Sequence, residues 1–260
     1  RLHQGSRPLL ISMPHVGTHI PDEQLRRMTP VASIVPDTDW HLERLYDFAR
    51  ELDASVLVAT SSRYVIDLNR PPDDENLYPG QDTTGVCPID TFDKEPLYLD
   101  GAVPDAVEIR RRITQVWEPY HAALRAELAR LRQAHGAVAL WDAHSIRSVL
   151  PRFFEGRLPD LNLGTADGRS CAPELARAVA GIAASATGYT SVLNGRFKGG
   201  YITRAYGDPA AGIHAVQLEL AEAAYMNESY PFAFDDDKAQ RLRPTLHAML
   251  DAMLAHAEHG

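Results

Sequence analysis

VALWDAHSI, residues 138–146, is an apolar run that carries an acid and an imidazole, Asp142 and His144, at its end. A short apolar run bounded by turn residues predicts a buried strand. Two similar runs, PLLISM at residues 8–13 and SVLVAT at 55–60, precede it. Helix-like segments separate these runs, and alternating strands and helices favour an α/β fold. We therefore expect one α/β domain over residues 1–260, built on a mostly parallel sheet.

The remaining elements follow from hydrophobic spacing. A helix is expected over residues 37–54, with Asp37, Thr38 and Asp39 as candidates for its N-cap. A long amphipathic helix is expected over 106–136, with Pro119 interrupting it and Gly136 ending it. Two further helices are expected at 172–187 and 239–260, and further strands at 63–68, 191–197 and 213–220. Residues 69–104 are rich in Pro, Asp, Asn and Gly, which is typical of a functional loop.

The composition narrows the class of protein. The formal net charge of −9 over 260 residues argues against a nucleic-acid-binding surface. The chain contains no apolar run near the ~20 residues that a membrane span needs. Cys87 and Cys171 are too few for a disulfide framework or a cysteine zinc site, so we expect a cytoplasmic protein. The oligomeric state stays open between a monomer and a homodimer.

Polar residues collect where several strands are expected to end. His15 follows the apolar run at 8–13, and His144 lies at the end of the run at 138–146. Glu219 lies in the strand expected at 213–220, and Asp39 lies at the start of the helix expected at 37–54. In open α/β sheets, ligands bind outside the carboxyl ends of the strands. Two imidazoles and a carboxylate could hold a catalytic zinc, with Glu219 as the base. Taken singly, each histidine is more often an ordinary hydrogen-bonded residue, and Asp39 is more often an N-cap.

A second group of polar residues predicts an anionic ligand. Arginine suits bidentate capture of a carboxylate, and the Gly199-Gly200 pair would let the backbone approach a ligand closely. The alternative is that these arginines form structural ion pairs with acids such as Asp67. The group comprises Arg63, Asp67, Asn69, Arg70, Asn194, Arg196, Lys198, Tyr201, Thr203 and Arg204.

With these residues assembled, the chain resembles the N-formylglutamate amidohydrolase family. The resemblance runs from about residue 8 to about residue 228 and is carried by PHVGTHIP, DTDWHLERLYDFARELDASVLVATSSRYVIDLNRPP, LYPGQDTTGVCP, WDAHSIRS, PDLNLGTADGRSCAP, NGRFKGGYITRAYG and HAVQLEL. It implies a three-layer fold similar to the zinc carboxypeptidases and aspartoacylases. It also implies hydrolysis of N-formyl-L-glutamate to formate and L-glutamate, the last step of a histidine degradation pathway.

The resemblance also implies roles for individual residues. His15, Asp39 and His144 would bind one zinc ion, with Asp37 as the alternative acidic ligand and other divalent metals possible. Glu219 would be the general base. Independently of the resemblance, Asp142 lies two residues before His144 on the same face of the expected strand, so we expect it to orient His144 or to form a wall of the pocket. Arg63, or else Arg196 or Arg204, would stabilise the oxyanion. The carboxylates of the substrate would be held by Asn69, Arg70, Asn194, Arg196, Thr203 and Arg204.

Two other functions remain open at this point. One is a related zinc amidase or carboxypeptidase that acts on another N-acylated acidic amino acid. The other is a non-catalytic binding protein for acidic amino acids. The length of the loop at about 71–103 further suggests that it closes over the pocket as a lid.

Overall fold

A seven-stranded sheet forms the centre of the computed structural model, which describes residues 1–77 and 80–259. The strand order is β1-β3-β2-β4-β7-β5-β6. Four neighbouring pairs are parallel, while β1 with β3 and β5 with β7 are antiparallel. The prediction of a mixed, mostly parallel sheet is confirmed. The strands are Leu2–His3, Leu9–Met13, Ser55–Val58, Val138–Ile146, Leu161–Gly164, Ser191–Leu193 and Ile213–Ala221 in chain order, β1 to β7.

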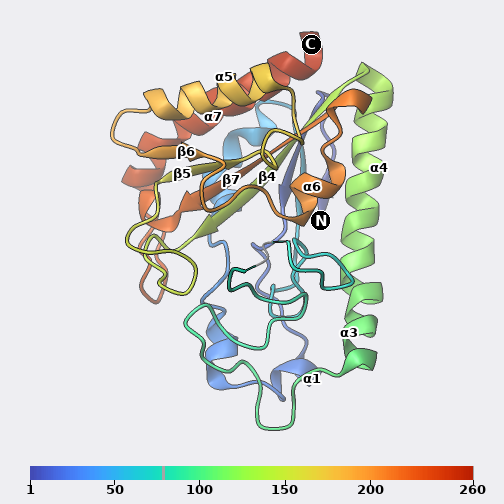
Figure 1. The fold of residues 1–260 in the computed structure, drawn as a ribbon, viewed down its shortest axis with the longest axis vertical. Helices are drawn as coiled ribbons and strands as arrows, with labels where there is room; N and C mark the ends of the chain where they lie inside the picture. The colour runs from blue at the N-terminus through green and yellow to red at the C-terminus, as the bar shows by residue number, and fades with distance from the viewer. Residues whose placement is uncertain (78–79, 260) are drawn as a thin grey trace.

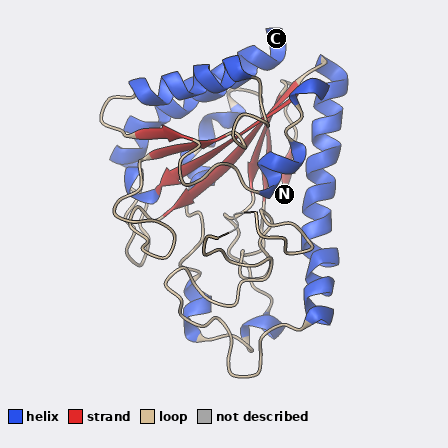
Figure 2. Cartoon of the chain, in the orientation of Figure 1, coloured by secondary structure: helices blue, strands red, loops and turns tan. Residues whose placement is uncertain are grey.

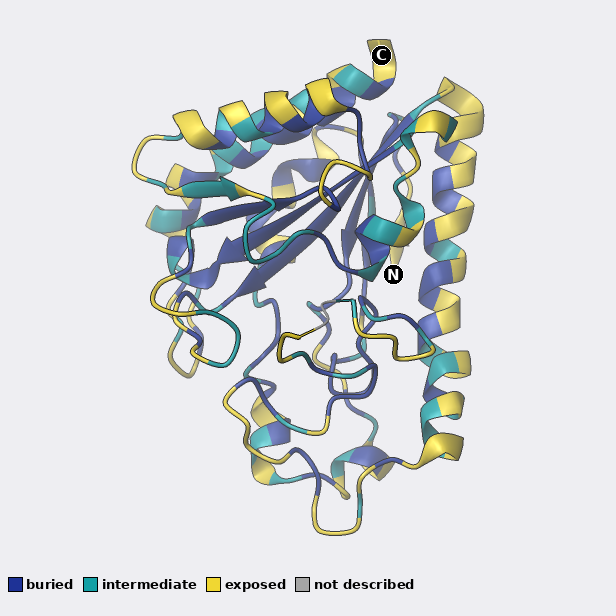
Figure 3. Ribbon diagram, viewed as in Figure 1, coloured by how far each residue is buried: buried dark blue, intermediate teal, exposed yellow. Residues whose placement is uncertain are grey.

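Helices cover the sheet on both faces (Figures 1 and 2). α5 (Pro173–Ser185) and α7 (Asp236–His259) lie on one face, and α4 (Glu118–His135) lies along the other. Successive strand side chains point to opposite faces, so Leu9 and Ile11 of β2 join the α5–α7 core, whereas Leu10 joins the α4 core. The central strands of the sheet are accordingly buried, whereas the edge strands β1 and β6 and the outer faces of the helices are more exposed (Figure 3).

Short helices and an irregular region complete the fold. α1 (Asp22–Leu25), α2 (Leu42–Leu45) and α6 (Tyr201–Tyr206) are each only one or two turns long. The region 69–104 has no helix or strand among its described residues, as its composition predicted. No helix in the described ranges combines the length and the apolar character that crossing a membrane requires.

The long helix is interrupted near its proline, as expected. α3 (Ala106–Arg112) passes into a π-helical turn at Ile113–Trp117 before α4 begins. A proline lacks the N–H that continues an α-helical ladder, and a π-turn is a known way to absorb such a break. Gly136, with φ of 86°, ends α4 as predicted.

The structure corrects three predicted elements. Residues 37–54 form only α2 and a 3₁₀ turn at Asp47–Arg50, and no side chain caps α2. His41, with φ of 63°, ends the preceding loop, so Asp39 is turned away from the helix. Residues 63–68 form turns rather than a strand, because the backbone N–H of Val65 donates to the carbonyl of Ser62 at 2.9 Å instead of pairing with a neighbouring strand. The strand predicted at 191–197 ends at Leu193, and β1, β5 and α6 were not predicted.

Candidate metal centre and substrate pocket

Three buried side chains, His15, Asp39 and His144, meet at the carboxyl edge of the sheet. His15 lies two residues after β2, and His144 lies near the end of the adjacent strand β4. The backbone N–H of Asp39 donates to the carbonyl of His15 at 3.0 Å, which brings this loop to the same edge. Nδ1 of His144 lies 3.2 Å from Nδ1 of His15 and 3.2 Å from Oδ2 of Asp39. Nδ1 of His15 lies 3.7 Å from the same oxygen.

Carboxylates hold the other nitrogen of each histidine. Nε2 of His15 lies 2.7 Å from Oδ1 of Asp67, and Nε2 of His144 lies 3.1 Å from Oδ2 of Asp142. A proton on each Nε2 leaves a lone pair on each Nδ1, which is the arrangement that metal-binding histidines use. Burial would raise the pKa of Asp67, but His15 and Arg63 hold that pKa well below its usual range.

The three atoms that face one another, Nδ1 of His15, Nδ1 of His144 and Oδ2 of Asp39, have the spacing of ligands around a divalent cation. With protons on both Nε2 atoms, two imidazole lone pairs and a carboxylate oxygen face one another with no donor hydrogen between them. Ligand bonds of ~2.0–2.1 Å at tetrahedral angles place neighbouring ligands about 3.3 Å apart. The observed separations of 3.2 to 3.7 Å match that spacing. Although burial opposes ionisation, the pKa of Asp39 is lowered by the positive charge and the hydrogen bonds that His15 and His144 offer when protonated, and a bound cation would favour the same ionised form.

Asp37 and Asp39, the two candidate acidic metal ligands, make different contacts. Oδ2 of Asp37 accepts from the hydroxyl of Tyr64 at 2.6 Å and from the backbone N–H of Phe92 at 2.8 Å. The carboxylate of Asp37 therefore anchors the loop that carries Phe92. Asp39 is the acid that belongs to the histidine cluster.

Glu219 lies beside this cluster on β7. It pairs in register with His144 of β4, and its side chain faces the same pocket. Its carboxylate accepts a hydrogen bond from Nε2 of Gln217 at 3.3 Å. Burial raises the pKa of Glu219 to about 8. A carboxyl group with a pKa near the working pH can both take up and release a proton.

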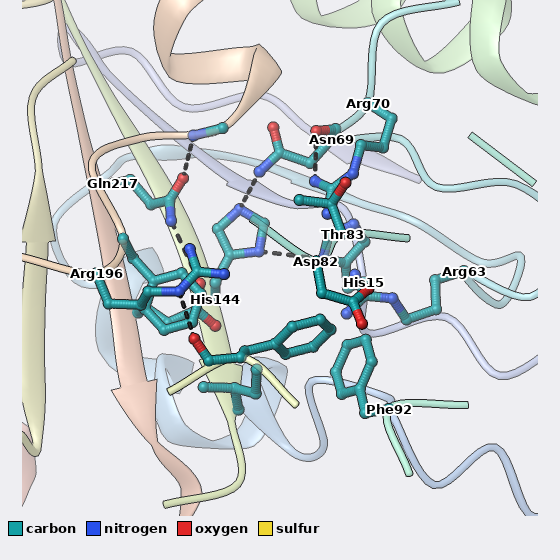
Figure 4. Close-up of a pocket in the computed structure, with 15 residues that line it drawn as sticks. His15, Arg63, Asn69, Arg70, Asp82, Thr83, Phe92, His144, Arg196 and Gln217 are labelled. Atoms are coloured by element: carbon teal, nitrogen blue, oxygen red, sulfur yellow. Dashed lines mark hydrogen bonds between the residues drawn. The ribbon is translucent and has the colours of Figure 1, made fainter. Parts of the chain in front are cut away.

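A pocket opens in front of these residues (Figure 4) and encloses about 580 Å³, counting the part open to solvent. That size suits a small molecule. Its walls combine cationic, apolar and amide groups. They are formed by His15, Arg63, Asn69, Arg70, Asp82, Thr83, Phe92, His144, Ile146, Phe153, Arg196, Phe197, Gly200, Gln217 and Glu219.

The predicted substrate residues divide into two sets. Arg63, Asn69, Arg70 and Arg196 line the pocket. The guanidinium of Arg63 donates to Asp67 at 2.9 Å and lies 3.7 Å from Oδ1 of Asp39. Arg63 therefore forms the structural ion pair that the sequence offered as the alternative to ligand binding, and it also lines the pocket.

The side chain of Asn69 reaches the metal-binding cluster. Its Oδ1 accepts from the backbone N–H of Ile202 at 2.8 Å, which directs Nδ2 to within 3.0 Å of Nε2 of His144. That nitrogen therefore has an acceptor, Asp142, on one side and a donor on the other. A proton on Nε2 would be donated to Asp142, whereas a lone pair on Nε2 would accept from the Asn69 amide, so the tautomer of His144 decides between these two contacts.

Three predicted substrate residues lie outside the pocket lining. Asn194 uses both ends of its amide on Thr165, at 2.8 Å each, and so holds a turn. Thr203 is fully buried, and its hydroxyl lies 3.4 Å from Oδ2 of Asp142. Arg204 donates to the carbonyl of Gly199 at 2.8 Å. None of the three is among the residues that line the pocket, and their role in substrate binding stays a prediction.

Sequence reasoning also missed residues of the site. Gln217 and Phe92 line the pocket without having been predicted. Asp67 was named as an ion-pair partner of the arginines, but its contact with His15 at 2.7 Å was not predicted. Gln217 was detectable in principle, because it lies two residues before Glu219 and so shares its strand face. Phe92 had no such signal, since it lies in an irregular loop.

The loop at about 71–103 contributes Asp82, Thr83 and Phe92 to the pocket wall. Arg152 binds the carboxylates of Asp82 and Asp90 at 3.1 and 2.8 Å. Residues 78 and 79 of this loop lie outside the described residues. The loop therefore borders the pocket, and its closure as a lid stays a prediction.

A buried acid next to the site gives a pH-dependent prediction. Burial raises the pKa of Glu222 well above its ordinary value of 4.5, and its Oε2 has no hydrogen-bond partner among the described residues. A raised pKa in the folded state stabilises the fold at low pH, and this contribution is lost as the pH rises above 4.5. We expect Glu222→Gln to raise the free energy of unfolding by on the order of 1 kcal/mol, more at about pH 8 than at about pH 5. Urea unfolding at both pH values measures this, and an equal change at both would contradict it.

Known proteins are similar to this chain along most of its length. A model of the N-formylglutamate amidohydrolase family matches residues 7–226. An N-formylglutamate deformylase of Pseudomonas putida is 55% identical over 97% of this chain and 94% of its own length. One from Pseudomonas aeruginosa is 52% identical over the same shares.

Solved structures agree with this comparison. The crystal structure of N-formylglutamate amidohydrolase from Ralstonia eutropha JMP134 superposes with a TM-score of 0.81 at 28% identity, covering 97% of this chain and 96% of that one. A protein from Agrobacterium tumefaciens, at 20% identity and a TM-score of 0.72 over 97% and 94% of the two chains, shares the fold. The family match and the two relatives above half identity show that this chain belongs to the N-formylglutamate amidohydrolase family.

Proposed function

We propose that this protein is a metal-dependent N-formylglutamate deformylase, which hydrolyses N-formyl-L-glutamate to formate and L-glutamate. One observation carries the proposal: His15, Asp39 and His144 converge beside Glu219 in a pocket lined by arginines. The relatives that carry the name deformylase align over nearly the whole chain. We further propose that the whole chain acts as one catalytic domain, in the cytoplasm, at the end of histidine degradation.

His15, Asp39 and His144 would hold the metal ion. Zinc suits two imidazoles and a carboxylate, although the same donors also admit manganese, cobalt or iron. The chemistry that such an ion supplies is polarisation of a carbonyl and a lowered pKa of a bound water. Asp67 and Asp142 would keep both histidines in the ligating tautomer.

Glu219 would move the proton. As a carboxylate it can accept a proton from the attacking water, and as an acid it can deliver that proton to the departing amine of glutamate. Burial raises the pKa of Glu219 to about 8 and so favours the protonated form, whereas the positive charges of His144 and Arg63 favour the ionised form.

The cationic residues would bind and stabilise negative charge. Arg63 lies 3.7 Å from Oδ1 of Asp39 and would therefore stabilise the charge that the formyl oxygen acquires beside the metal-binding cluster. Arg70 and Arg196 line the pocket together with Asn69, and with its amide they would hold the two carboxylates of glutamate. Since a formyl group offers little surface to bind, these two carboxylates would supply most of the selectivity.

A substrate panel tests the proposal. We expect kcat/KM for N-formyl-L-glutamate to exceed that for N-acetyl-L-glutamate by about 10- to 100-fold, because an added methyl group must fit beside Phe92 and Phe153. N-succinyl-L-glutamate should be poorer still. Formate and amine release measure turnover. A preference for the acetyl or succinyl compound would indicate a different zinc amidase, and binding without any release would indicate a binding protein.

A further inference from the structure

β7 places two polar side chains of the pocket two residues apart on one strand face. They are Gln217 and Glu219, which are 3% and 8% exposed. Nε2 of Gln217 lies 3.3 Å from Oε2 of Glu219. We propose that Gln217 is a positioning residue that holds the carboxylate of Glu219 in its reactive orientation, and that the backbone of Gly200 fixes Gln217 for this task. The inference rests on the proposed role of Glu219 as the base.

The orientation of the Gln217 amide is set by a backbone donor. The N–H of Gly200 donates to Oε1 of Gln217 at 2.7 Å. A backbone N–H can only donate, so the atom that it contacts is the carbonyl oxygen of the amide. The NH₂ group must then point the other way, toward Glu219. Gln217 thus presents a donor to the carboxylate and cannot reverse without losing the contact to Gly200.

Gly200 is held in place by a second amide. A Cβ at position 200 would lie 2.3 Å from Nδ2 of Asn69, so a side chain has no room there. Asn69 in turn accepts from the backbone N–H of Ile202 at 2.8 Å and lies 3.0 Å from His144. The segment 200–202 therefore fixes two amides, one directed at Glu219 and the other at the metal-binding cluster (Figure 4).

Positioning matters because a glutamate side chain has several rotatable bonds. A proton acceptor that moves by about 1 Å from its productive position can lose about 10²-fold in rate. One donor on Oε2 restricts these rotations and leaves Oε1 of the carboxylate for water. The neighbour on the antiparallel strand β5, Asn162, bonds to the backbone carbonyl of Glu219 at 3.0 Å and so fixes the main chain only.

Two substitutions at Gln217 distinguish its contact with Glu219 from its contact with Gly200. Gln217→Glu keeps an acceptor for Gly200 but replaces the donor facing Glu219 with a second carboxylate oxygen. Gln217→Met removes both contacts at similar size. We expect kcat to fall by about 10- to 100-fold in both variants, while the metal content per chain stays at the wild-type level. KM for N-formyl-L-glutamate should stay at the wild-type level in the uncharged variant, Gln217→Met. Gln24→Glu, which makes the same change at a buried amide of α1, should retain wild-type turnover.

Each other outcome overturns the inference. Wild-type kcat in Gln217→Glu with a loss in Gln217→Met would show that the residue only supports Gly200. A raised KM with unchanged kcat would make Gln217 a substrate contact, and loss of metal or of cooperative unfolding in both variants would make it structural. Glu219→Gln is measured in parallel. Full activity of Glu219→Gln would refute the proposed base itself. If Glu219→Gln loses activity while both Gln217 variants keep wild-type kcat, only the positioning role is refuted.

Discussion

Glu219→Gln is expected to bind metal at the wild-type level and to lose about 10²- to 10⁴-fold in kcat. The amide has the same size and can fill the same place on β7, beside Gln217 and opposite His144. It cannot accept a proton from water, so the step that depends on proton transfer is lost. Because the pocket wall is unchanged, affinity for the product L-glutamate should be preserved.

The measurement combines formate release, metal analysis and calorimetric binding of L-glutamate. Glu222→Gln is a suitable control, because it makes the same change in a neighbouring buried acid that lies outside the pocket lining. Turnover of Glu219→Gln within a few-fold of the wild type would refute the assignment of the base. A loss of metal would instead assign Glu219 to the metal-binding cluster.

His144→Ala is expected to lose both metal and activity. The substitution removes the atom that lies 3.2 Å from each of the other two inner donors, so only His15 and Asp39 remain. Two ligands hold zinc far more weakly than three, and without metal the reaction loses several kcal/mol of stabilisation, about 10³-fold or more in rate. Metal content after gel filtration, measured together with turnover, checks the expectation.

Two further variants make that result specific. Asp142→Asn should retain metal with reduced activity, because an amide can still occupy the position beside Nε2 of His144 but carries no charge to strengthen the ligand. His19→Ala removes an exposed histidine four residues after His15 and should change neither property. Normal metal content in His144→Ala would contradict the assignment of this residue as a ligand.

The elements predicted well are those with a strong local signal. The apolar runs at β2, β4 and β7 are long enough to be identified from sequence, and the rule that ligands meet at the carboxyl edge of a sheet placed His15, His144 and Glu219 together. The register that sets His144 beside Glu219 is a tertiary property, and no local pattern encodes it.

The incorrect prediction of a helix at 37–54 has a tertiary cause as well. The expected helix at 37–54 has the right apolar spacing, yet His41 adopts a positive φ and the preceding loop delivers Asp39 to the histidines. Asn194 and Thr203 have the chemistry of substrate ligands, but they bond to Thr165 and Asp142. Residue type alone could not distinguish a polar group that faces the pocket from one that supports it.

Reconstitution with metal tests the central claim most directly. The wild-type chain would be stripped with a chelator, titrated with zinc, and assayed for formate release from N-formyl-L-glutamate after each addition. The account predicts no turnover in the stripped protein and a linear rise that ends at one equivalent per chain, the capacity of the single cluster formed by His15, Asp39 and His144 in the described residues. Full turnover in the stripped protein, or a rise that continues well beyond one equivalent, would contradict it.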